Sequence, residues 1–305
     1  MSFLKRSSTK PAPQPSSVGK PDPKKATAFV KEFILPVIVV AMAGAMLSVP
    51  FGSHVLAKSG QQPEANPQAT PEAKEDSDID PAAVEAVKKM GAYLRSLKAF
   101  QVTADVTHDD VLEDGLIVQS NSKIDMIAAK PNRMRVEVTA DDKHRLYLYD
   151  GKDFTVWGRI LNYYATVPAP PTIRELFQKI DEKYDVELPL IDLFTWGTNE
   201  DDINKIKTAV DVGPATVEGV TCEQYAFRQE GVDWQLWIQL GEFPLPRRLV
   251  ITTLTDEARP QHGDTFSWNL APSYNDAAFV FDPPPGAQRV VLETRQPADA
   301  TEKGK

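Results

Sequence analysis

The sequence predicts a mainly β fold of the α+β class, in which an antiparallel sheet of about eleven strands is accompanied by a few helices. Apolar and polar residues alternate with a period of two across two long regions, 100–166 and 208–270. Turn-forming pairs rich in Gly, Asn, Asp and Pro interrupt both regions at short intervals, which is typical of strands joined by tight connections. Helical periodicity occurs before the first region and between the two.

A helix is predicted at the start of the folded body, which we place at Asp80. Asp80 is a favourable N-cap residue, and Pro81 suits the first helical position. Apolar side chains then recur at helical spacing to about residue 98 and mark one face, formed by Val84, Val87, Leu94 and Leu97. Because the helix is amphipathic, we expect it to lie on an apolar surface.

The first strand region, 100–166, predicts six strands. Turns are indicated at Asp114-Gly115, Pro131-Asn132, Asp150-Gly151 and Asn162. Because strands with short connections pair with their neighbours in the chain, the region predicts an antiparallel meander.

The segment between the two strand regions predicts helices. Thr172 and Glu175 have the spacing of a capping box. The apolar stripe that follows consists of Ile173, Leu176, Phe177 and Ile180. Residues 188–197 (LPLIDLFTWG) indicate an apolar surface or a short helix, and 199–207 indicate another helical turn or two.

The second strand region begins at Thr208 and centres on residues 219–254, which predict three consecutive strands. In the middle strand, one face consists of Val232, Trp234, Leu236, Ile238 and Leu240, and the other of Asp233, Gln235, Trp237 and Gln239. A further strand is predicted at 263–270, and a final short strand or turn at 278–281.

The N-terminal part of the sequence predicts export across a membrane. Residues 1–32 are basic, rich in Pro and Ser, and predicted to be disordered. Residues 33–57 predict either a signal peptide cleaved after Ala57 or an N-terminal anchor, with 33–51 uncharged for 19 residues. Both alternatives place the folded body in the periplasm, because basic flanks stay inside. The remaining predicted parts are a Pro-rich acidic linker at 58–79, one folded domain at 80–292 and a polar tail at 293–305.

Charge and cysteine content exclude several classes of protein. Outside the first 31 residues, 27 basic side chains face 42 acidic ones, so the body would be repelled by nucleic acid. The single cysteine, Cys222, allows no internal disulfide and no multi-cysteine zinc site. Its position on a predicted strand favours a small buried core residue over a reactive thiol.

Motifs of known catalytic chemistry are not found in the sequence, so we expect no enzyme, no cofactor and no metal. His108, Asp109 and Asp110 could supply an acid–base group or a metal ligand, but they fall at a strand end beside a turn, where polar clusters usually face water. A large one-layer sheet with few helices leaves part of its apolar face uncovered, which predicts a ligand cavity. The candidate lining residues are Trp157, Tyr163, Tyr164, Trp196, Trp234, Leu236 and Trp268.

The order of elements, together with segments 151–177, 188–197, 211–240, 244–253 and 268–287, resembles the LolA/LolB-like lipoprotein-localisation superfamily. Within it, the chain is similar to the predicted periplasmic proteins of domain-of-unknown-function family 2092. The resemblance covers roughly 80–292 and implies a strongly curved half-barrel whose concave face is closed by helices. For the family it implies no enzymatic activity, although characterised relatives in the superfamily receive acyl chains or a signalling peptide in this cavity. The chain lacks the lipobox cysteine of the acylated members.

Three functions remain open from the sequence. The first is a periplasmic carrier for an acyl chain or another hydrophobic molecule. The second is an interaction or sensing module for a protein partner, tethered to the inner membrane through 33–51 if that segment is uncleaved. The third is a hydrolase that uses His108 with Asp109 or Asp110, which the motif content disfavours.

Overall fold

The computed structural model describes residues 78–184, 186, 188–196 and 203–294. The predictions of a disordered N-terminus, a signal or anchor, and nearly all of the linker lie outside the described residues, as does the tail from residue 295.

The described residues form a 12-stranded sheet with its two long helices on one side. Its strands, in chain order, are β1 Ala99–Val111, β2 Ile117–Ala129, β3 Arg133–Ala140, β4 His144–Tyr149, β5 Asp153–Gly158, β6 Tyr163–Pro168, β7 Thr208–Val217, β8 Val220–Gln229, β9 Val232–Gln239, β10 Pro246–Thr253, β11 Gln261–Asn269 and β12 Gln288–Arg289. The helices are α2 Pro81–Ser96, α3 Ile173–Tyr184, α4 Asp192–Thr195 and the 3₁₀ turn η1 Asp276–Phe279.

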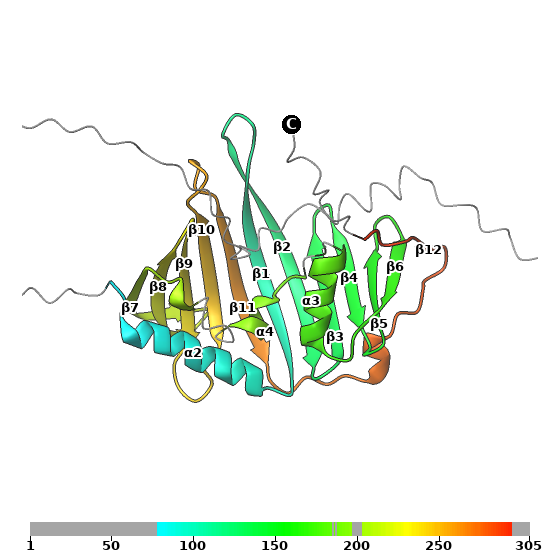
Figure 1. Ribbon diagram of the computed structural model, residues 1–305, viewed down its shortest axis with the longest axis horizontal. Coiled ribbons are helices and arrows are strands. Elements are labelled where there is room, and N and C mark those ends of the chain that lie inside the picture. The colour runs from blue at the N-terminus through cyan, green and yellow to red at the C-terminus, as the bar shows by residue number, and fades with distance from the viewer. Residues whose placement is uncertain (1–77, 185, 187, 197–202, 295–305) are drawn as a thin grey trace, which may run out of the picture.

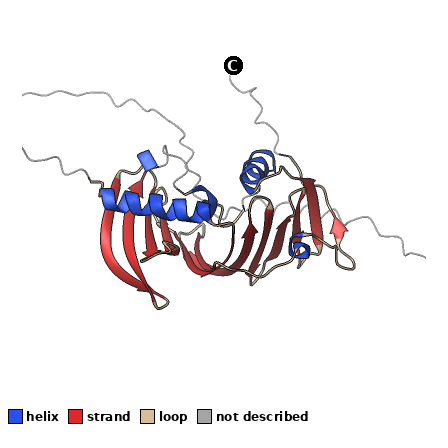
Figure 2. Cartoon of the chain, turned by 90° about the horizontal axis from the view of Figure 1, so that it is seen from below, coloured by secondary structure: helices blue, strands red, loops and turns tan. Residues whose placement is uncertain are grey.

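The two strand regions of the sequence join in the middle of this sheet. The strand order is β12-β6-β5-β4-β3-β2-β1-β11-β10-β9-β8-β7, so each region is a meander and β1 pairs with β11 to connect them. The sheet curves, and α2 and α3 lie on the same side of it, α2 across the β7–β11 half and α3 in front of β3 and β4 (Figures 1 and 2). The predicted mainly β fold with a strongly curved sheet and few helices is confirmed.

One hydrophobic core fills the space between the sheet and the helices, and we call the side of the sheet that faces it the inner face. Strand register sets the core side chains side by side, as in the row Val102, Met126, Val136, Tyr147, Val156 and Ala165. Helix α2 contributes Val87, Met90 and Leu94, which are all buried. The row continues towards the other sheet half through Trp268, the register partner of Val102.

Helix α2 begins where the sequence predicts, because the Asp80 carboxylate accepts a hydrogen bond from the Ala82 amide at 2.8 Å and Pro81 opens the first turn. One half of the predicted capping box is confirmed, because the Thr172 hydroxyl accepts from the Glu175 amide at 3.2 Å. The Glu175 carboxylate accepts from the Thr172 hydroxyl at 2.9 Å.

Two features at the C-terminal end differ from the prediction. Residues 276–279 form the 3₁₀ turn η1 where a final short strand or turn was expected at 278–281, and Phe279 is buried there. The twelfth strand, β12, pairs parallel to β6 through its backbone. With two residues it is too short to show a period of two, so the alternation pattern could not reveal it.

Candidate functional site

The structure contains a cavity of about 680 Å³ between α3 and the segment 186–195. The last turn of α2 and the turn that joins β2 to β3 also border it. The lining residues are Arg95, Lys130, Pro131, Thr172, Ile173, Arg174, Phe177, Gln178, Asp181, Val186, Leu188, Ile191, Phe194 and Thr195. They come from four separate stretches of the chain, which only the tertiary fold brings together.

Helix α3 forms one wall because its sequence is amphipathic. Ile173 and Phe177, one turn apart, turn inward, and both are buried although they border the cavity. The helix is held over the β2–β3 turn by a hydrogen bond from the Ile173 amide to the Pro131 carbonyl at 2.9 Å.

The opposite wall, which consists of Val186 and residues 188–195, is positioned against α2 by a glycine. A Cβ atom at Gly91 would collide with the carbonyl oxygen of Trp196, so only glycine lets α2 come this close to the end of α4. The same carbonyl oxygen accepts a hydrogen bond from the Arg95 guanidinium at 2.5 Å. The contact fixes both the wall and one of the cations of the cavity.

Aromatic rings connect the cavity to the sheet. Phe177 and Phe194 meet edge to face with ring centroids 5.1 Å apart. Phe194 in turn lies 5.7 Å from Phe100, and Phe100 lies 5.5 Å from Trp268. The apolar part of the cavity is therefore continuous with the core, and its walls are backed by packed side chains.

The charged residues of the cavity are mostly cations. Lys130 is half-buried, and its ammonium group donates to the carbonyl oxygens of Leu94 and Arg95 at 3.0 Å each. Burial lowers the pKa of Lys130, and the nearby positive charges of Arg95 and Arg174 lower it further. Asp181 supplies the one acidic side chain among the lining residues.

The seven candidate residues from the sequence lie elsewhere, and none lines this cavity. Five of them are on the helix-covered side: Tyr163, Trp196, Trp234, Leu236 and Trp268 pack in or against the core. Trp234 stacks on Phe227 with centroids 3.9 Å apart, and its indole N–H donates to the Gln229 amide oxygen.

Trp157 and Tyr164 lie on the outer face, the side of the sheet opposite the core. They are register partners on β5 and β6, and each alternates with core residues along its strand. Both contact Phe281, at centroid distances of 5.7 and 4.9 Å, and the Arg159 guanidinium lies 5.1 Å from the Trp157 ring. They are covered by the C-terminal segment, on the side away from the cavity.

Sequence reasoning missed Arg95, Lys130, Arg174 and Phe177 as site residues, because nothing local marks them. The helical stripe that includes Phe177 was recognised, as was the apolar segment 188–197, and these were the available signals. Tertiary packing places helix α3 and this apolar segment on opposite sides of the cavity, with the cations at one end.

The polar group His108, Asp109 and Asp110 lies at the end of β1 and meets His262 of β11. His108 and His262 are register partners with ring centroids 5.8 Å apart. His262 Nε2 lies 3.2 Å from Asp264 Oδ2, and His108 Nε2 lies 3.7 Å from Asp110 Oδ1. Within the described ranges, no three His, Cys, Asp or Glu side chains come together as a metal site.

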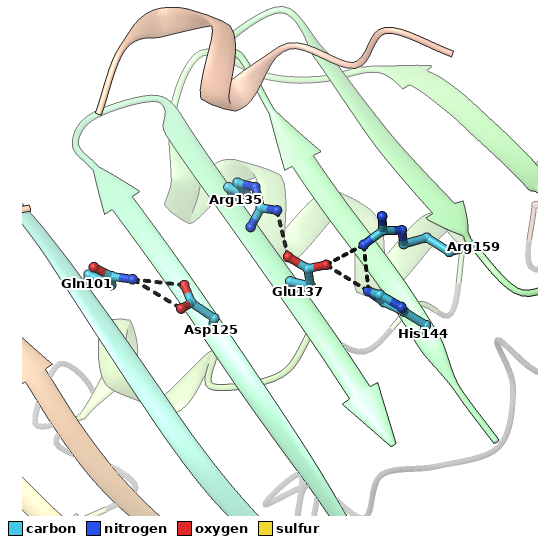
Figure 3. A network of polar contacts seen from close by, with 6 residues as sticks. All are labelled: Gln101, Asp125, Arg135, Glu137, His144 and Arg159. Carbon is cyan, nitrogen blue, oxygen red and sulfur yellow. Dashed lines mark hydrogen bonds and ion pairs between the residues drawn. The ribbon is translucent and has the colours of Figure 1, made fainter. Parts of the chain in front are cut away.

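A second polar network lies on the outer face of β3 and β4, shown in Figure 3 beside the Gln101–Asp125 pair. The Glu137 carboxylate accepts from Arg135 at 2.6 Å and from Arg159 at 2.8 Å, and it lies 2.7 Å from His144 Nε2. Burial raises the pKa of Glu137, but the hydrogen bonds from His144 and Arg135 outweigh it and lower the pKa to about 2. The network faces away from the cavity. Its hydrogen bonds join β3 to β4 and to Arg159, which follows β5, so it stabilises the packing of neighbouring strands.

Comparison with known families gives one match: the family model described as "Predicted periplasmic protein (DUF2092)" matches residues 83–293, which is more than half of the chain. The protein is accordingly periplasmic. No curated protein matches the sequence. None of the helices in the described part of the chain is long and apolar enough to cross a membrane.

Among solved structures, the chain is similar to the lipoprotein LppX of Mycobacterium tuberculosis, with 12% identity, a TM-score of 0.34 and coverage of 64% of this chain and 100% of that one. It is similar to a LolA superfamily protein of Nitrosomonas europaea, with 11% identity, a TM-score of 0.32 and coverage of 65% and 97%. It is also similar to the Pseudomonas aeruginosa MucA/MucB complex, with 13% identity, a TM-score of 0.38 and coverage of 66% and 61%.

Proposed function

This chain belongs to DUF2092, the predicted periplasmic proteins, and we propose that in the periplasm it is a non-catalytic binding protein for an acyl chain or another hydrophobic ligand. The ligand lies in the cavity between α3 and the segment 186–195. The observation that carries the proposal is the cavity itself, about 680 Å³ in volume, in which seven of the fourteen lining residues are apolar.

The cavity has the properties of a ligand site. Its volume falls within the roughly 300–1,000 Å³ that is usual for small-molecule sites. Ile173, Phe177 and Leu188 offer an apolar surface, and each methylene group that a ligand buried there would contribute about 0.8 kcal/mol. The walls are held by the Gly91 contact and the Phe177–Phe194 ring pair, so little ordering cost is left for binding.

The test is to identify what the protein carries. Protein isolated from the periplasm without detergent is extracted with organic solvent, and the extract is examined by mass spectrometry. The delipidated protein is then titrated with a fluorescent long-chain fatty-acid probe. Stoichiometric lipid in the extract and saturable probe uptake are the expected results, and the absence of both would refute the proposal.

A cavity-filling substitution locates the binding. Ile191 is half-buried and lines the cavity, so Ile191→Trp should occupy part of the volume and weaken probe uptake at least tenfold. The matched control is Val291→Trp, because the Val291 side chain is 82% exposed and is not among the lining residues. Equal affinity of both variants for the probe would place the ligand elsewhere.

A second candidate function, docking of a protein partner, is favoured by the β1–β2 hairpin. The hairpin projects beyond the rest of the sheet (Figure 1), because residues 109–119 make strand pairs only with each other. Four large apolar side chains are exposed at its tip: Leu112, Leu116, Ile117 and Val118. Exposed apolar clusters of this kind mark interaction sites, and the acids Glu113 and Asp114 beside them favour a partner surface with basic residues.

Site-specific photo-crosslinking tests the hairpin. A photoreactive residue at position 116 should give one discrete protein adduct in periplasm, and Ile117→Asp should abolish that adduct. The same photoreactive residue at position 291, which is also exposed, serves as the control. If positions 116 and 291 give the same pattern, the hairpin is not a docking site.

A further inference from the structure

The cavity has a distribution of charge that is unusual for this protein. The chain as a whole carries a formal net charge of −9, yet three cations and one acid line the cavity. The cations, Arg95, Lys130 and Arg174, come from the end of α2, the end of β2 and the start of α3. Three segments that are distant in sequence thus bring positive charge to one end of the apolar space.

These cations have donor groups to spare. In the described ranges none of the three forms an ion pair with a carboxylate. Two of the three donors of Lys130 go to the carbonyl oxygens of Leu94 and Arg95, and one of the five donors of Arg95 goes to Trp196. The partners are carbonyl groups, two of them in the last turn of α2, where the helix dipole offsets only part of the positive charge and no carboxylate neutralises the rest.

The environment of Lys130 adds a second observation. Its ammonium group is half-buried, and the positive charges of Arg95 and Arg174 are close enough to lower its pKa further than burial alone does. Three neighbouring like charges at a partly desolvated site repel one another. A bound anion would relieve this repulsion, whereas a neutral ligand would desolvate the cations further without any compensation.

The acid of the cavity is kept apart from the cations. Asp181 is seven residues after Arg174 on α3, which is a separation of roughly 10 Å along the helix axis. Phe177 lies between them on the wall. The carboxylate of Glu175 accepts a hydrogen bond from Thr172 in the capping box and is not part of the lining. The three cations therefore gather at one end of the cavity. Phe177, Leu188 and Phe194 supply apolar surface to the remaining lining, which also includes Gln178, Asp181 and Thr195.

We propose that the ligand is an amphiphile with an anionic head group on an acyl chain, the head bound by Arg95, Lys130 and Arg174 and the chain lying among Phe177, Leu188 and Phe194. This inference rests on the proposed function and names the ligand class of the same cavity. The Arg174 and Arg95 guanidinium groups donate to the oxygens of the head group, and the third N–H of Lys130 completes the site. Carboxylate and phosphate heads share this chemistry.

A matched ligand series tests the head group separately from the chain. Palmitic acid, hexadecyl phosphate and hexadecanol have the same chain, and each is used below its critical micelle concentration to displace the fluorescent probe from the full-length protein. We expect the two anionic ligands to bind at least tenfold more tightly than the alcohol. Equal affinities for all three would overturn the inference while leaving the proposed function intact. Failure of all three to displace a bound probe would likewise overturn the inference, whereas failure of the probe to bind, together with the absence of lipid from the solvent extract, would refute the proposed function itself.

Two variants and one competitor complete the test. Arg174→Met changes an exposed side chain and should remove most of the preference for the anionic ligands over hexadecanol. Lys123→Met, on β2 and paired with Asp105, is the control and should change neither. Inorganic phosphate at millimolar concentration should fail to displace the probe, because it has no chain. An unchanged preference in Arg174→Met, or displacement by phosphate as effective as by hexadecyl phosphate, would contradict the proposed arrangement.

Discussion

Acid should weaken this protein through Glu137, the carboxylate at the centre of the outer-face network in Figure 3. Its pKa is lowered from 4.5 to about 2 in the folded protein: burial opposes the change, and the hydrogen bonds from His144 and Arg135 outweigh burial. A carboxyl group whose pKa is depressed by folding stabilises the folded state above the unfolded pKa, and this contribution is lost as the pH falls towards the folded pKa. The stabilisation that Glu137 provides is therefore lost as the pH falls from 4.5 to about 2.

The magnitude follows from the pKa difference. The pKa of Glu137 falls from 4.5 in the unfolded chain to about 2 in the folded protein. At about 1.36 kcal/mol per pKa unit, this difference sets an upper limit of roughly 3.4 kcal/mol on the contribution of the ionised carboxylate to the free energy of unfolding. The Glu137 side chain is 22% exposed and that of its partner Arg159 is 43% exposed, so solvent screens the network. We expect a contribution of about 1–2 kcal/mol to the free energy of unfolding at pH 7.

The assay is urea unfolding of the wild type and of Glu137→Gln at several pH values between 7 and 2.5. The variant has no charge to lose at this position, so the stability difference between the two proteins should be about 1–2 kcal/mol at pH 7 and should shrink towards zero at the acid end. Asp105→Asn, which breaks an ion pair between side chains 66% and 62% exposed, should show no such convergence. If the difference in unfolding free energy between the wild type and Glu137→Gln stays constant with pH, the reasoning is refuted.

Three further outcomes are expected. Trp234→Asp should lower the free energy of unfolding by about 3–5 kcal/mol, because it removes the stack on Phe227 and places a charge against the core, whereas Gln235→Asp on the outer face should cost about 1 kcal/mol or less. Thermal melts of both variants check this: equal melting temperatures would contradict the assignment of the two faces of β9, and a lower one for Gln235→Asp would mean that the faces are reversed. Gly91→Ala should cost about 1–3 kcal/mol and weaken probe uptake, since the added methyl group displaces Trp196; urea unfolding and a probe titration measure both, and wild-type values would contradict the role of this glycine. N-terminal sequencing of the mature protein should decide between the two predictions for residues 33–57: a chain that starts at Lys58 has no membrane tether, and one that keeps 33–51 is anchored.

Local signals in the sequence determined most of the elements. The start of α2 at Pro81 follows from the Asp80 cap, and that of α3 follows from the Thr172–Glu175 capping box, because both signals act over a few residues. The strands of the two meanders follow from alternation and turn residues, since one face of each strand packs on the core.

Alternation did not determine which face a given aromatic side chain occupies. In β4 five of the six residues are buried, because the C-terminal segment covers the outer face of this half of the sheet while the core covers the inner face. With both faces covered, apolar residues occur at successive positions, and the pattern no longer distinguishes inside from outside. For this reason the sequence named Trp157 and Tyr164 as candidate cavity residues, whereas both lie half-buried on the outer face.

Only the tertiary structure decided where the cavity is. Arg95, Lys130 and Arg174 are exposed or half-buried cations in three separate segments, and on its own each has the sequence context of an ordinary surface residue. They meet for two reasons. Gly91 has no side chain, so the end of α4 can pack closely against α2, and the Ile173–Pro131 hydrogen bond holds α3 over the β2–β3 turn. Contacts between residues so far apart in the chain have no periodic signature, so the sequence by itself determined the sheet and its helices, and packing alone determined the site.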